Sequence, residues 1–512
     1  MMAVLFSRGR YLYVVYLIII LFFLNLTGFA TTYYISTTGN DVTGSGNLGN
    51  PWKTLRWATQ TVTTSGDIIH VIAGTYTETQ QCSLATGVSI DGDGMLTTII
   101  KSTVTGSFSG FLILSSPQDS NGAQSISNIT LDGQYVSEAN YKTWAGIWIT
   151  GRSNVIIHDT RIMNFKDRGV IFDGNDATDP PTDPGHYATG NKFYNNTVLN
   201  AAGNNGIYGA GLLNIGGQLG MEIYNNTMTQ DQRPNFKNGW PIKLWDNGWL
   251  KGVKIYNNTL TKAPYMGSYP GESGDWDFCI ELFHVSGLEI YNNIIQGSID
   301  LNYNTKDTYN FCAWIHHNTM SRTSLNSKFE SGIIFEFDTE TAIVENNTLN
   351  NVSTGVQFNT RNGSIISNCV IGKNLFTNLG FGDGTGTAGG ILIISEGTNN
   401  PVITNLYIYQ NTITAAPGKE PYVGIDLESM NSGSANGVII RNNIINGFTE
   451  AFIKGSSPTN MNNVVIVHNQ VTSNGNSNKP LWPGGDPTNY TYDYKLGDPN
   501  DQNGINFRTT GN

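Results

Sequence analysis

The chain has 512 residues, of which only 13% are charged, and it contains 59 Gly, 24 Tyr, 22 Phe and 10 Trp. This composition is typical of many short strands and tight turns, and it excludes a disordered chain. The formal net charge of −11 disfavours nucleic acid as a partner.

The N-terminal segment predicts export. Arg8 and Arg10 precede a 14-residue apolar run, YLYVVYLIIILFFL (11–24), and small and polar residues follow it up to Ala30. This order is typical of a secretory signal over residues 1–30, and the run is short for a membrane-spanning helix. We expect a secreted, periplasmic or cell-surface protein with no stable membrane insertion after cleavage. Removing two arginines and no acids changes the net charge to −11 − 2 = −13.

Residues 31–66 are predicted to form an N-terminal cap. The segment PWKTLRWATQTV (51–62) places Leu55, Ala58, Thr59 and Val62 on one side of a short helix that begins near Pro51. Such a helix would cover the open apolar end of a repetitive body.

A seven-residue phrase recurs through residues 67–474. The clearest copies are EIYNNTM (222–228), KIYNNTL (254–260), EIYNNII (289–295), IVENNTL (343–349) and IIRNNII (439–445). Looser copies extend the series, from IIHDTRI (156–162), where Asp159 takes the place of the second Asn, to VIVHNQV (465–471). The copies lie 25–37 residues apart, which is the mark of a solenoid.

The Asn-Asn pair predicts a corner between two strands. Asn adopts the left-handed backbone conformation more readily than most residues, so it suits a sharp bend. Because strand residues alternate between faces, Ile255 should point into the core and Tyr256 outward. If every coil bends here, the Asn amides stack and hydrogen-bond along the solenoid.

A second strand pattern recurs between the corners, with apolar second and fourth letters. Its copies are GIWIT (146–150), GVIFD (169–173), PIKLW (241–245), CIELF (279–283), SIDLN (298–302), GIIFE (332–336), GVQFN (355–359), GILII (390–394) and GIDLE (424–428). With two or three parallel strands per coil at about 4.8 Å spacing, a dozen coils make a body about 60 Å long.

Across roughly residues 67–474 these coils resemble the right-handed parallel β-helix proteins of the pectin-lyase-like superfamily. The segment YYISTTGNDVTGSGNLGNPWKTLRWATQTV (33–62) also resembles the N-terminal segment of many secreted members. The resemblance implies an all-β fold, a single right-handed parallel β-helix with a short N-terminal capping helix. The catalytic signatures of polygalacturonase-like hydrolases and of common pectate lyases are missing, so no family residue can be carried over.

The third and fifth letters of the second pattern form two outward rows of side chains. In the middle coils these rows contain charged residues that could take part in catalysis. Lys243, Glu281 and Asp300 stand in the third-letter row, and Glu336 stands in the fifth-letter row. We take these four as catalytic candidates. The flanking residues Trp245, Phe283, His284 and Asp246 are candidates for substrate binding. The insertions 261–278 and 304–310 emerge near these coils and could wall the site.

Three interpretations of this patch stay open. Neighbouring coils place Glu281 and Asp300 about 4.8 Å apart at the backbone, and two coils separate Glu281 from Glu336 by about 9.6 Å. Both spacings suit carboxylate pairs for glycoside hydrolysis. Alternatively, Glu281 and Asp300 hold Ca²⁺ while Lys243 is the base of a β-elimination. The third interpretation is a solvated cross-strand ion pair.

The four cysteines, Cys82, Cys279, Cys312 and Cys369, lie far apart and have no metal-ligand spacing. We expect buried thiols rather than a zinc site. Residues 475–512 lose the coil pattern and are predicted to form a loop-rich cover or tail. No oligomer interface is evident in the sequence, so a monomer is expected.

The sequence therefore predicts a secreted carbohydrate-active β-helix protein, a polysaccharide lyase or a glycoside hydrolase, with a polysaccharide bound along its outer face. The alternative is a non-catalytic glycan-binding or cell-surface structural protein.

Overall fold

The computed structural model describes residues 30–106, 109–136, 143–174, 187–203, 210–230, 239–246, 248–262, 278–322, 331–361, 363–380, 389–396, 401–418, 423–426, 434–448, 450–452, 461–472 and 490–492. The predicted signal lies outside these ranges except for Ala30, and so does most of the predicted C-terminal cover. Within the described ranges, no helix is both long enough and apolar enough to cross a membrane.

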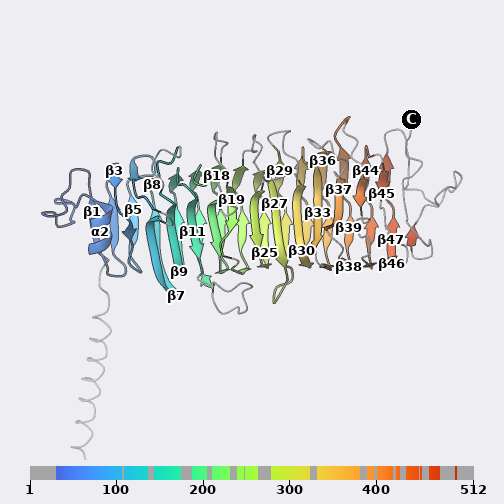
Figure 1. Ribbon diagram of the computed structural model, residues 1–512, viewed down its shortest axis with the longest axis horizontal. Coiled ribbons are helices and arrows are strands. Elements are labelled where there is room, and N and C mark those ends of the chain that lie inside the picture. Colours follow the sequence, from blue (N-terminus) through green and yellow to red (C-terminus); the bar gives the residue numbers. More distant parts are fainter. Residues whose placement is uncertain are drawn as a thin grey trace, which may run out of the picture.

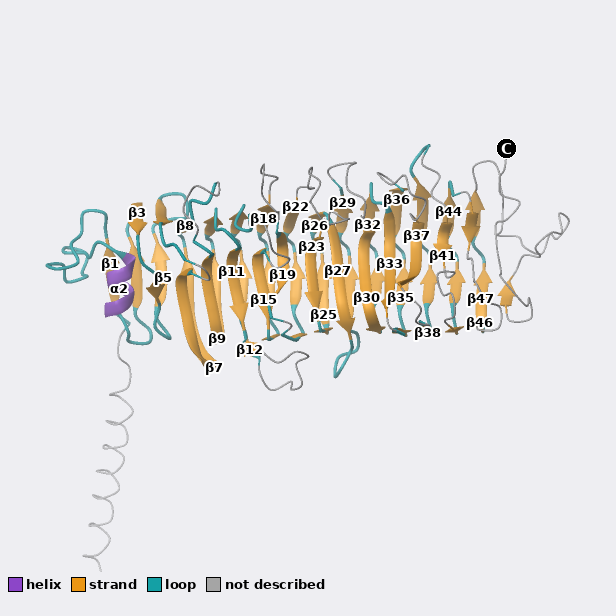
Figure 2. Cartoon of the chain, viewed as in Figure 1, coloured by secondary structure: helices purple, strands orange, loops and turns teal. Residues whose placement is uncertain are grey.

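The chain winds as a parallel solenoid along one axis, so successive coils stack side by side from the N-terminal to the C-terminal end (Figures 1 and 2). Each coil contributes three main strands, which we call the first, second and third series in chain order. The first and second series share a 31-stranded parallel sheet, and the third forms a separate 14-stranded sheet. The predicted right-handed parallel β-helix is thereby confirmed.

The first series contains the strands with the GIxLy pattern. It comprises β4 (Cys82–Ser83), β7 (Gly110–Ser127), β9 (Ala145–His158), β11 (Arg168–Asp173), β15 (Gly211–Gly216), β19 (Trp240–Leu244), β23 (Phe278–Phe283), β27 (Ser298–Asn304), β30 (Ser331–Glu340), β33 (Thr354–Arg361), β37 (Gly389–Glu396), β41 (Val423–Asp426) and β45 (Glu450–Phe452).

The second series ends at the Asn corner, and β7 and β9 are long enough to continue into it. Its other members are β1 (Thr32–Ile35), β2 (Ile68–Val71), β5 (Ser89–Gly92), β13 (Lys192–Tyr194), β17 (Glu222–Tyr224), β21 (Lys254–Tyr256), β25 (Leu288–Tyr291), β28 (Ala313–His316), β31 (Ile343–Glu345), β35 (Val370–Gly372), β39 (Tyr407–Tyr409), β43 (Ile439–Arg441), β47 (Val464–Val467) and β49 (Tyr490–Tyr492).

The third series follows the corner. It comprises β3 (Gly74–Glu78), β6 (Thr98–Ser102), β8 (Thr130–Asp132), β10 (Arg161–Met163), β14 (Thr197–Leu199), β18 (Thr227–Gln230), β22 (Thr259–Lys262), β26 (Ile294–Gln296), β29 (Thr319–Ser321), β32 (Thr348–Asn350), β36 (Leu375–Leu379), β40 (Thr412–Ala415), β44 (Ile444–Asn446) and β48 (Gln470–Thr472).

Short strands mark the turn between the first and second series. They are β12 (Ala188–Thr189), β16 (Gln218–Leu219), β20 (Leu250–Lys251), β24 (Val285–Ser286), β34 (Ile365–Ser367), β38 (Val402–Thr404), β42 (Ser434–Asn436) and β46 (Met461–Asn462).

The N-terminal end is covered by the helix α2 (Leu55–Thr61). Thr54 caps it, because its hydroxyl accepts a hydrogen bond from the Trp57 N–H. Leu55, Ala58 and Thr59 are buried against the first coils, and so is Val62, as the spacing predicted.

The solenoid body extends past both predicted boundaries of residues 67 and 474. Within the predicted cap, β1 already pairs in parallel with β2. Within the predicted C-terminal cover, β49 pairs in parallel with β47.

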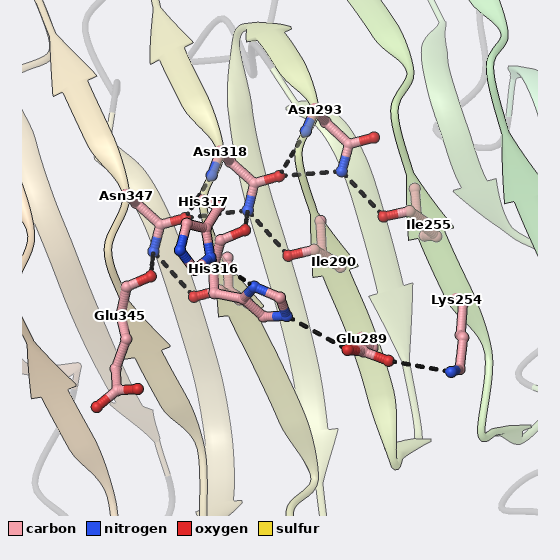
Figure 3. Close-up of polar contacts among 11 residues, drawn as sticks. Lys254, Ile255, Glu289, Ile290, Asn293, His316, His317, Asn318, Glu345 and Asn347 are labelled. Carbon is pink, nitrogen blue, oxygen red and sulfur yellow. Dashed lines mark hydrogen bonds and ion pairs between the residues drawn. The ribbon is translucent and has the colours of Figure 1, made fainter.

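The corners carry an unbroken ladder of buried amides. In each coil the first residue of the pair is left-handed, as at Asn257 (φ 55°), and the second donates along the axis. The Nδ2 of Asn293, for example, donates to the Asn318 Oδ1 at 3.0 Å and to the Ile255 carbonyl at 2.9 Å (Figure 3). The ladder members are Asn196, Asn226, Asn258, Asn293, Asn318, Asn347, Asn374, Asn411, Asn443 and Asn469.

The alignment of Asp159 with this ladder was wrong by one residue. Asp159 is the left-handed residue of its corner (φ 51°), and Thr160 occupies the ladder position. The Thr160 hydroxyl donates to the Asn196 Oδ1 at 2.7 Å, so a hydroxyl ends the stack of amides.

Candidate functional site

Three charged side chains from successive first-series strands meet on the outer face of the solenoid. Lys243 on β19 pairs in register with Glu281 on β23, which pairs with Asp300 on β27. Asn214, in a coil whose register the repeat pattern left open, pairs with Lys243 on the other side. The strand register therefore brings the predicted third-letter row together.

The centre of this group is an ion pair between the Lys243 Nζ and the Glu281 Oε2. Both side chains are largely buried, at 8% and 12% exposure. The ammonium lies 4.3 Å from the ring centre of Trp240 and 5.9 Å from that of Phe283, so aromatic faces enclose it. This burial separates the pair from ordinary surface salt bridges.

The pKa of Lys243 is lowered to about 7, chiefly by burial and in smaller part by the positive charge of Arg168. Asp300 acts in the opposite direction and raises the pKa. The contact with Glu281 also favours the ammonium. Lys243 is therefore an amine whose proton can leave near neutral pH.

The four catalytic candidates do not form one cluster. Asp300 is buried on the strand next to Glu281. Glu336 lies one strand farther along on β30, in the fifth-letter row, beside Asn302 and Asn359. Its carboxylate accepts a hydrogen bond at 3.1 Å from the Asn359 Nδ2 on β33, on the side away from the Lys243 pair.

A tryptophan cluster with a buried arginine adjoins the charged group on the N-terminal side. The rings of Trp144, Trp148 and Trp245 lie 5.4–6.1 Å apart. The Arg168 guanidinium carbon lies 5.4 Å from the ring centres of Trp144 and of Trp245. The Trp144 Nε1 donates to the Asp167 Oδ2 at 2.7 Å, which fixes the ring.

Sequence reasoning identified Trp245 but placed it beside Phe283, and it missed Trp144, Arg168 and Trp240. Two of the missed residues, Arg168 and Trp240, share the column immediately before the five-letter strand pattern, on either side of Gly211. Had the pattern been read one letter earlier, that column would have contained Arg168, Trp240 and Phe278 in nearly successive coils.

The aromatic surroundings contain unused hydrogen-bond donors. Among the residues that the structure describes, the buried indole N–H groups of Trp148, Trp240 and Trp245 have no acceptor. Buried donors are usually satisfied, and unpaired ones cost free energy. Trp148 and Trp245 belong to the cluster beside Arg168, and Trp240 lies beside Lys243. Three such donors on neighbouring strands are consistent with a surface that a hydroxyl-rich ligand completes.

Two predicted binding residues lie at the edge of this surface. Asp246 follows β19 in a left-handed conformation (φ 45°), where burial raises its pKa and Arg168 lowers it. His284 is buried at the next corner, with its ring between those of Trp249 and Tyr303. These ring contacts place His284 in the aromatic stack of the corner.

The insertion 304–310 folds onto the corner instead of walling the charged group. Asp307 pairs with Lys251 at 2.5 Å, and the Tyr309 ring lies against Gly252 and Gly287. The other predicted wall, residues 261–278, lies outside the described residues between 263 and 277.

The residues present do not fit a calcium site. One of the two proposed carboxylates, Glu281, is already paired with the Lys243 ammonium. Within the described ranges, no three His, Cys, Asp or Glu side chains converge as metal ligands. The four cysteines are buried thiols, and none of them forms a disulfide.

No protein-family model and no curated protein matches the sequence. Among solved structures, the tailspike protein of E. coli bacteriophage HK620 in complex with a pentasaccharide is similar, with a TM-score of 0.54 at 12% identity over 87% of this chain and 76% of the tailspike. The catalytic domain of Agl-KA has a TM-score of 0.46 at 16% identity over 78% of this chain, which spans 63% of that domain.

A third similar structure is the catalytic unit of a GH87 alpha-1,3-glucanase from Streptomyces thermodiastaticus, with a TM-score of 0.41 at 13% identity over 83% of this chain and 70% of that unit. At 12% identity, the likeness to the tailspike shows the fold alone. The chain therefore has the right-handed parallel β-helix fold that the coil motif predicted.

Proposed function

We propose that this protein is an extracellular carbohydrate-active enzyme that cleaves a polysaccharide bound along the outer face of the first series. The observation that carries the proposal is the buried pair of Lys243 and Glu281 beside Asp300, enclosed by aromatic rings. Aromatic faces with unpaired N–H donors suit sugar rings and their hydroxyls. The similar tailspike was solved with a pentasaccharide, which supports a glycan as the ligand of this architecture.

The lysine favours β-elimination as the reaction. In its neutral form the Lys243 amine can take the proton from the carbon next to a uronate carboxyl group. The C–H electrons then form a carbon–carbon double bond, the glycosidic C–O bond breaks, and the leaving oxygen takes a proton from solvent. The pKa of about 7 provides the neutral amine at ordinary pH.

Hydrolysis is a second candidate because Glu281 and Asp300 occupy adjacent strands. Their backbone spacing is about 4.8 Å, close to the separation of about 5–5.5 Å between the carboxyl groups of retaining glycosidases. The ion pair with Lys243 keeps Glu281 ionised, which suits a nucleophile, and Asp300 would then supply the proton.

The test is a screen of the purified protein on neutral and uronate-containing polysaccharides, following new reducing ends and the ultraviolet absorbance of unsaturated uronates. Both signals rising identifies a lyase, and reducing ends alone identify a hydrolase. Neither signal rising over a broad panel, together with saturable glycan binding, would overturn the proposal in favour of a binding protein.

Lys243→Ala should lower the cleavage rate by about 10²–10⁴-fold if the amine acts as a general base. Lys254→Ala is the matched control, because Lys254 forms a similar ion pair with Glu289, at 3.4 Å, on the second series (Figure 3). Its lysine is half exposed, so its loss should leave the rate unchanged. Equal rates for the two variants would remove Lys243 from the reaction.

A further inference from the structure

Arg168 is a buried cation whose hydrogen-bonding capacity the protein leaves largely unused. Its residue exposure is 7%, yet its one hydrogen bond is a long contact of 3.4 Å from the Nη1 to the Asp167 carbonyl. Its Nε is buried without an acceptor, and no carboxylate within the described ranges lies within ion-pair distance. The rings of Trp144 and Trp245 flank the guanidinium.

The other buried arginine of the N-terminal half shows what a purely structural role requires. Arg152 is 3% exposed and donates to the Ser116 hydroxyl, the Gln124 Oε1 and the carbonyls of Leu84 and Ser115, all at 2.7–3.0 Å. Burial lowers the pKa of both arginines to about 10, so both are cations at neutral pH. Among the described residues, the fold therefore gives the Arg152 guanidinium four short hydrogen bonds and the Arg168 guanidinium one long one.

A buried charge without partners is costly, and an anionic ligand would remove that cost. The planar guanidinium pairs with a carboxylate through two parallel hydrogen bonds. The rings of Trp144 and Trp245 lie next to each other beside the guanidinium, with ring centres 6.1 Å apart, and they offer aromatic faces for a sugar ring. Asp167 and Asp246 stand nearby and would repel an anion that approached from their side, so orientation matters.

We propose that Arg168, with Trp144 and Trp245, forms a subsite for the carboxylate of an acidic sugar residue. This inference rests on the proposed function and names the substrate class of the same surface. The subsite lies on β11, two strands before Lys243 on β19, so it is separate from the reacting group. It would hold a sugar residue about 9.6 Å along the axis from the ion pair, at two strand spacings of about 4.8 Å.

The inference is tested by binding to a double variant, Lys243→Ala with Glu281→Gln, which lacks both the proposed base and the proposed nucleophile and should not consume its ligand. Calorimetry would compare oligogalacturonate, oligoglucuronate and an alginate oligomer with their methyl esters, in which the same backbones carry no charge, and with a sulfated neutral oligosaccharide. We expect at least one acid form to bind tenfold or more tighter than its ester. Adding Arg168→Gln should remove that difference and leave binding of the ester unchanged.

Two further variants keep the result interpretable if Arg168→Gln disturbs the fold. Arg168→Lys retains the charge without the planar fork, so it should keep part of the preference for the acid. Arg152→Gln should lower the melting temperature but keep the full preference. The inference would be overturned if Arg168→Gln left the ratio of acid to ester affinity unchanged, or if no acid form bound. If the sulfated ligand bound more tightly than every acid form, the preferred group would be a sulfate and the carboxylate assignment would be wrong.

The two proposals fail in distinguishable ways. Selective binding of an acid form without any cleavage by the wild-type protein would leave the subsite and remove the enzymatic function. If the protein cleaved a neutral polysaccharide and Arg168→Gln did not change the rate, the enzymatic function would stand and the assignment of an acidic substrate would be wrong.

Discussion

The Lys243 amine pairs with Glu281 and lies within the electrostatic influence of Asp300, and the direction of the pH dependence depends on which form of the amine reacts. Its pKa is lowered to about 7 mainly by burial, so the fraction of neutral amine rises as the pH increases through 7. If the neutral amine is the base, the cleavage rate should rise over this interval and then level off. If hydrolysis needs the ammonium beside Glu281, the rate should fall over the same interval.

The pH–rate profile of kcat/KM checks this directly. Under the elimination mechanism, Lys243→Ala should lose the limb near pH 7 together with the activity, while Lys254→Ala should keep both. If a partly active Lys243→Ala variant still showed the rise in kcat/KM near pH 7, the titration would belong to another group.

At the residue scale, the sequence predicted the charged group and missed its neighbours for a physical reason. Lys243, Glu281 and Asp300 occupy equivalent letters of a strand repeat, and parallel pairing in register brings such letters together. Trp245 and Arg168 meet across coils through long side chains. A strand repeat assigns a side chain to one face of the sheet, but it does not specify which neighbours a long side chain reaches along that face. Glu336 was proposed as a partner of Glu281 from the number of coils between them. Glu336 lies in the fifth-letter row, whereas Glu281 lies in the third-letter row.

The corners could be predicted from the sequence because one residue type, Asn, meets both requirements of the bend: the backbone conformation and the hydrogen bonds along the axis. The first Asn accepts the left-handed backbone, and the second supplies an amide that can both donate and accept along the axis. The one misaligned corner contains Asp159 and Thr160. Asp159 was assigned to the ladder because Asp resembles Asn chemically, although its position is that of the left-handed residue.

Replacing a central member of this ladder should be costly. In Asn293→Ala the Asn258 amide loses its acceptor, and the Ile255 carbonyl loses a donor, all within the buried stack. At about 1–3 kcal/mol for each buried group left unpaired, we expect a loss of about 3 kcal/mol in the free energy of unfolding. Denaturant unfolding followed by circular dichroism measures it.

The adjacent residue provides the control. Ile294 is 53% exposed at a position where neighbouring coils carry Thr259 and Thr319. Ile294→Thr should therefore change stability by no more than about 0.5 kcal/mol. A similarly small change for Asn293→Ala would show that water or backbone adjustment replaces the ladder.

The stacked aromatic residues of the second series should not act as sugar platforms. Tyr194, Tyr224, Tyr256 and Tyr291 lie in nearly parallel planes with ring centres 4.8–4.9 Å apart. Each ring covers the face of the next, so only edges and hydroxyls reach solvent. The abundance of tyrosine in the composition thus reflects solenoid packing as well as binding.

For the whole molecule, the N-terminal cap links stability to pH. The buried Glu78 carboxyl accepts a hydrogen bond from the Leu55 N–H at 2.6 Å, at the start of α2. Burial raises its pKa from 4.5 to about 7, and the hydrogen bonds from the helix backbone oppose this only in part. Since the folded protein favours the protonated form, its contribution to stability is complete below pH 4.5 and is lost as the pH rises through about 7.

Amide hydrogen exchange in residues 55–62 should report this loss. We expect protection of α2 in the wild-type protein to decrease between pH 5 and pH 8, after correction for the intrinsic exchange rate. Glu78→Gln keeps an acceptor without the charge and should remove the decrease, whereas Glu340→Gln, at a partly exposed acid on β30, should not. Equal pH dependence in all three proteins would contradict a cap governed by Glu78.

The register of the first series also fixes the axial distance between the two proposed sites in whole strand spacings. Arg168 and Lys243 stand on strands separated by the single intervening strand β15, and each side chain takes its axial position from the pairing. A coil gained or lost between them would shift the anion subsite against the reacting group by one whole strand spacing. The length of glycan between its anchored residue and its cleaved bond is thus set in discrete steps by the number of coils, and side-chain substitutions can only adjust it within a step.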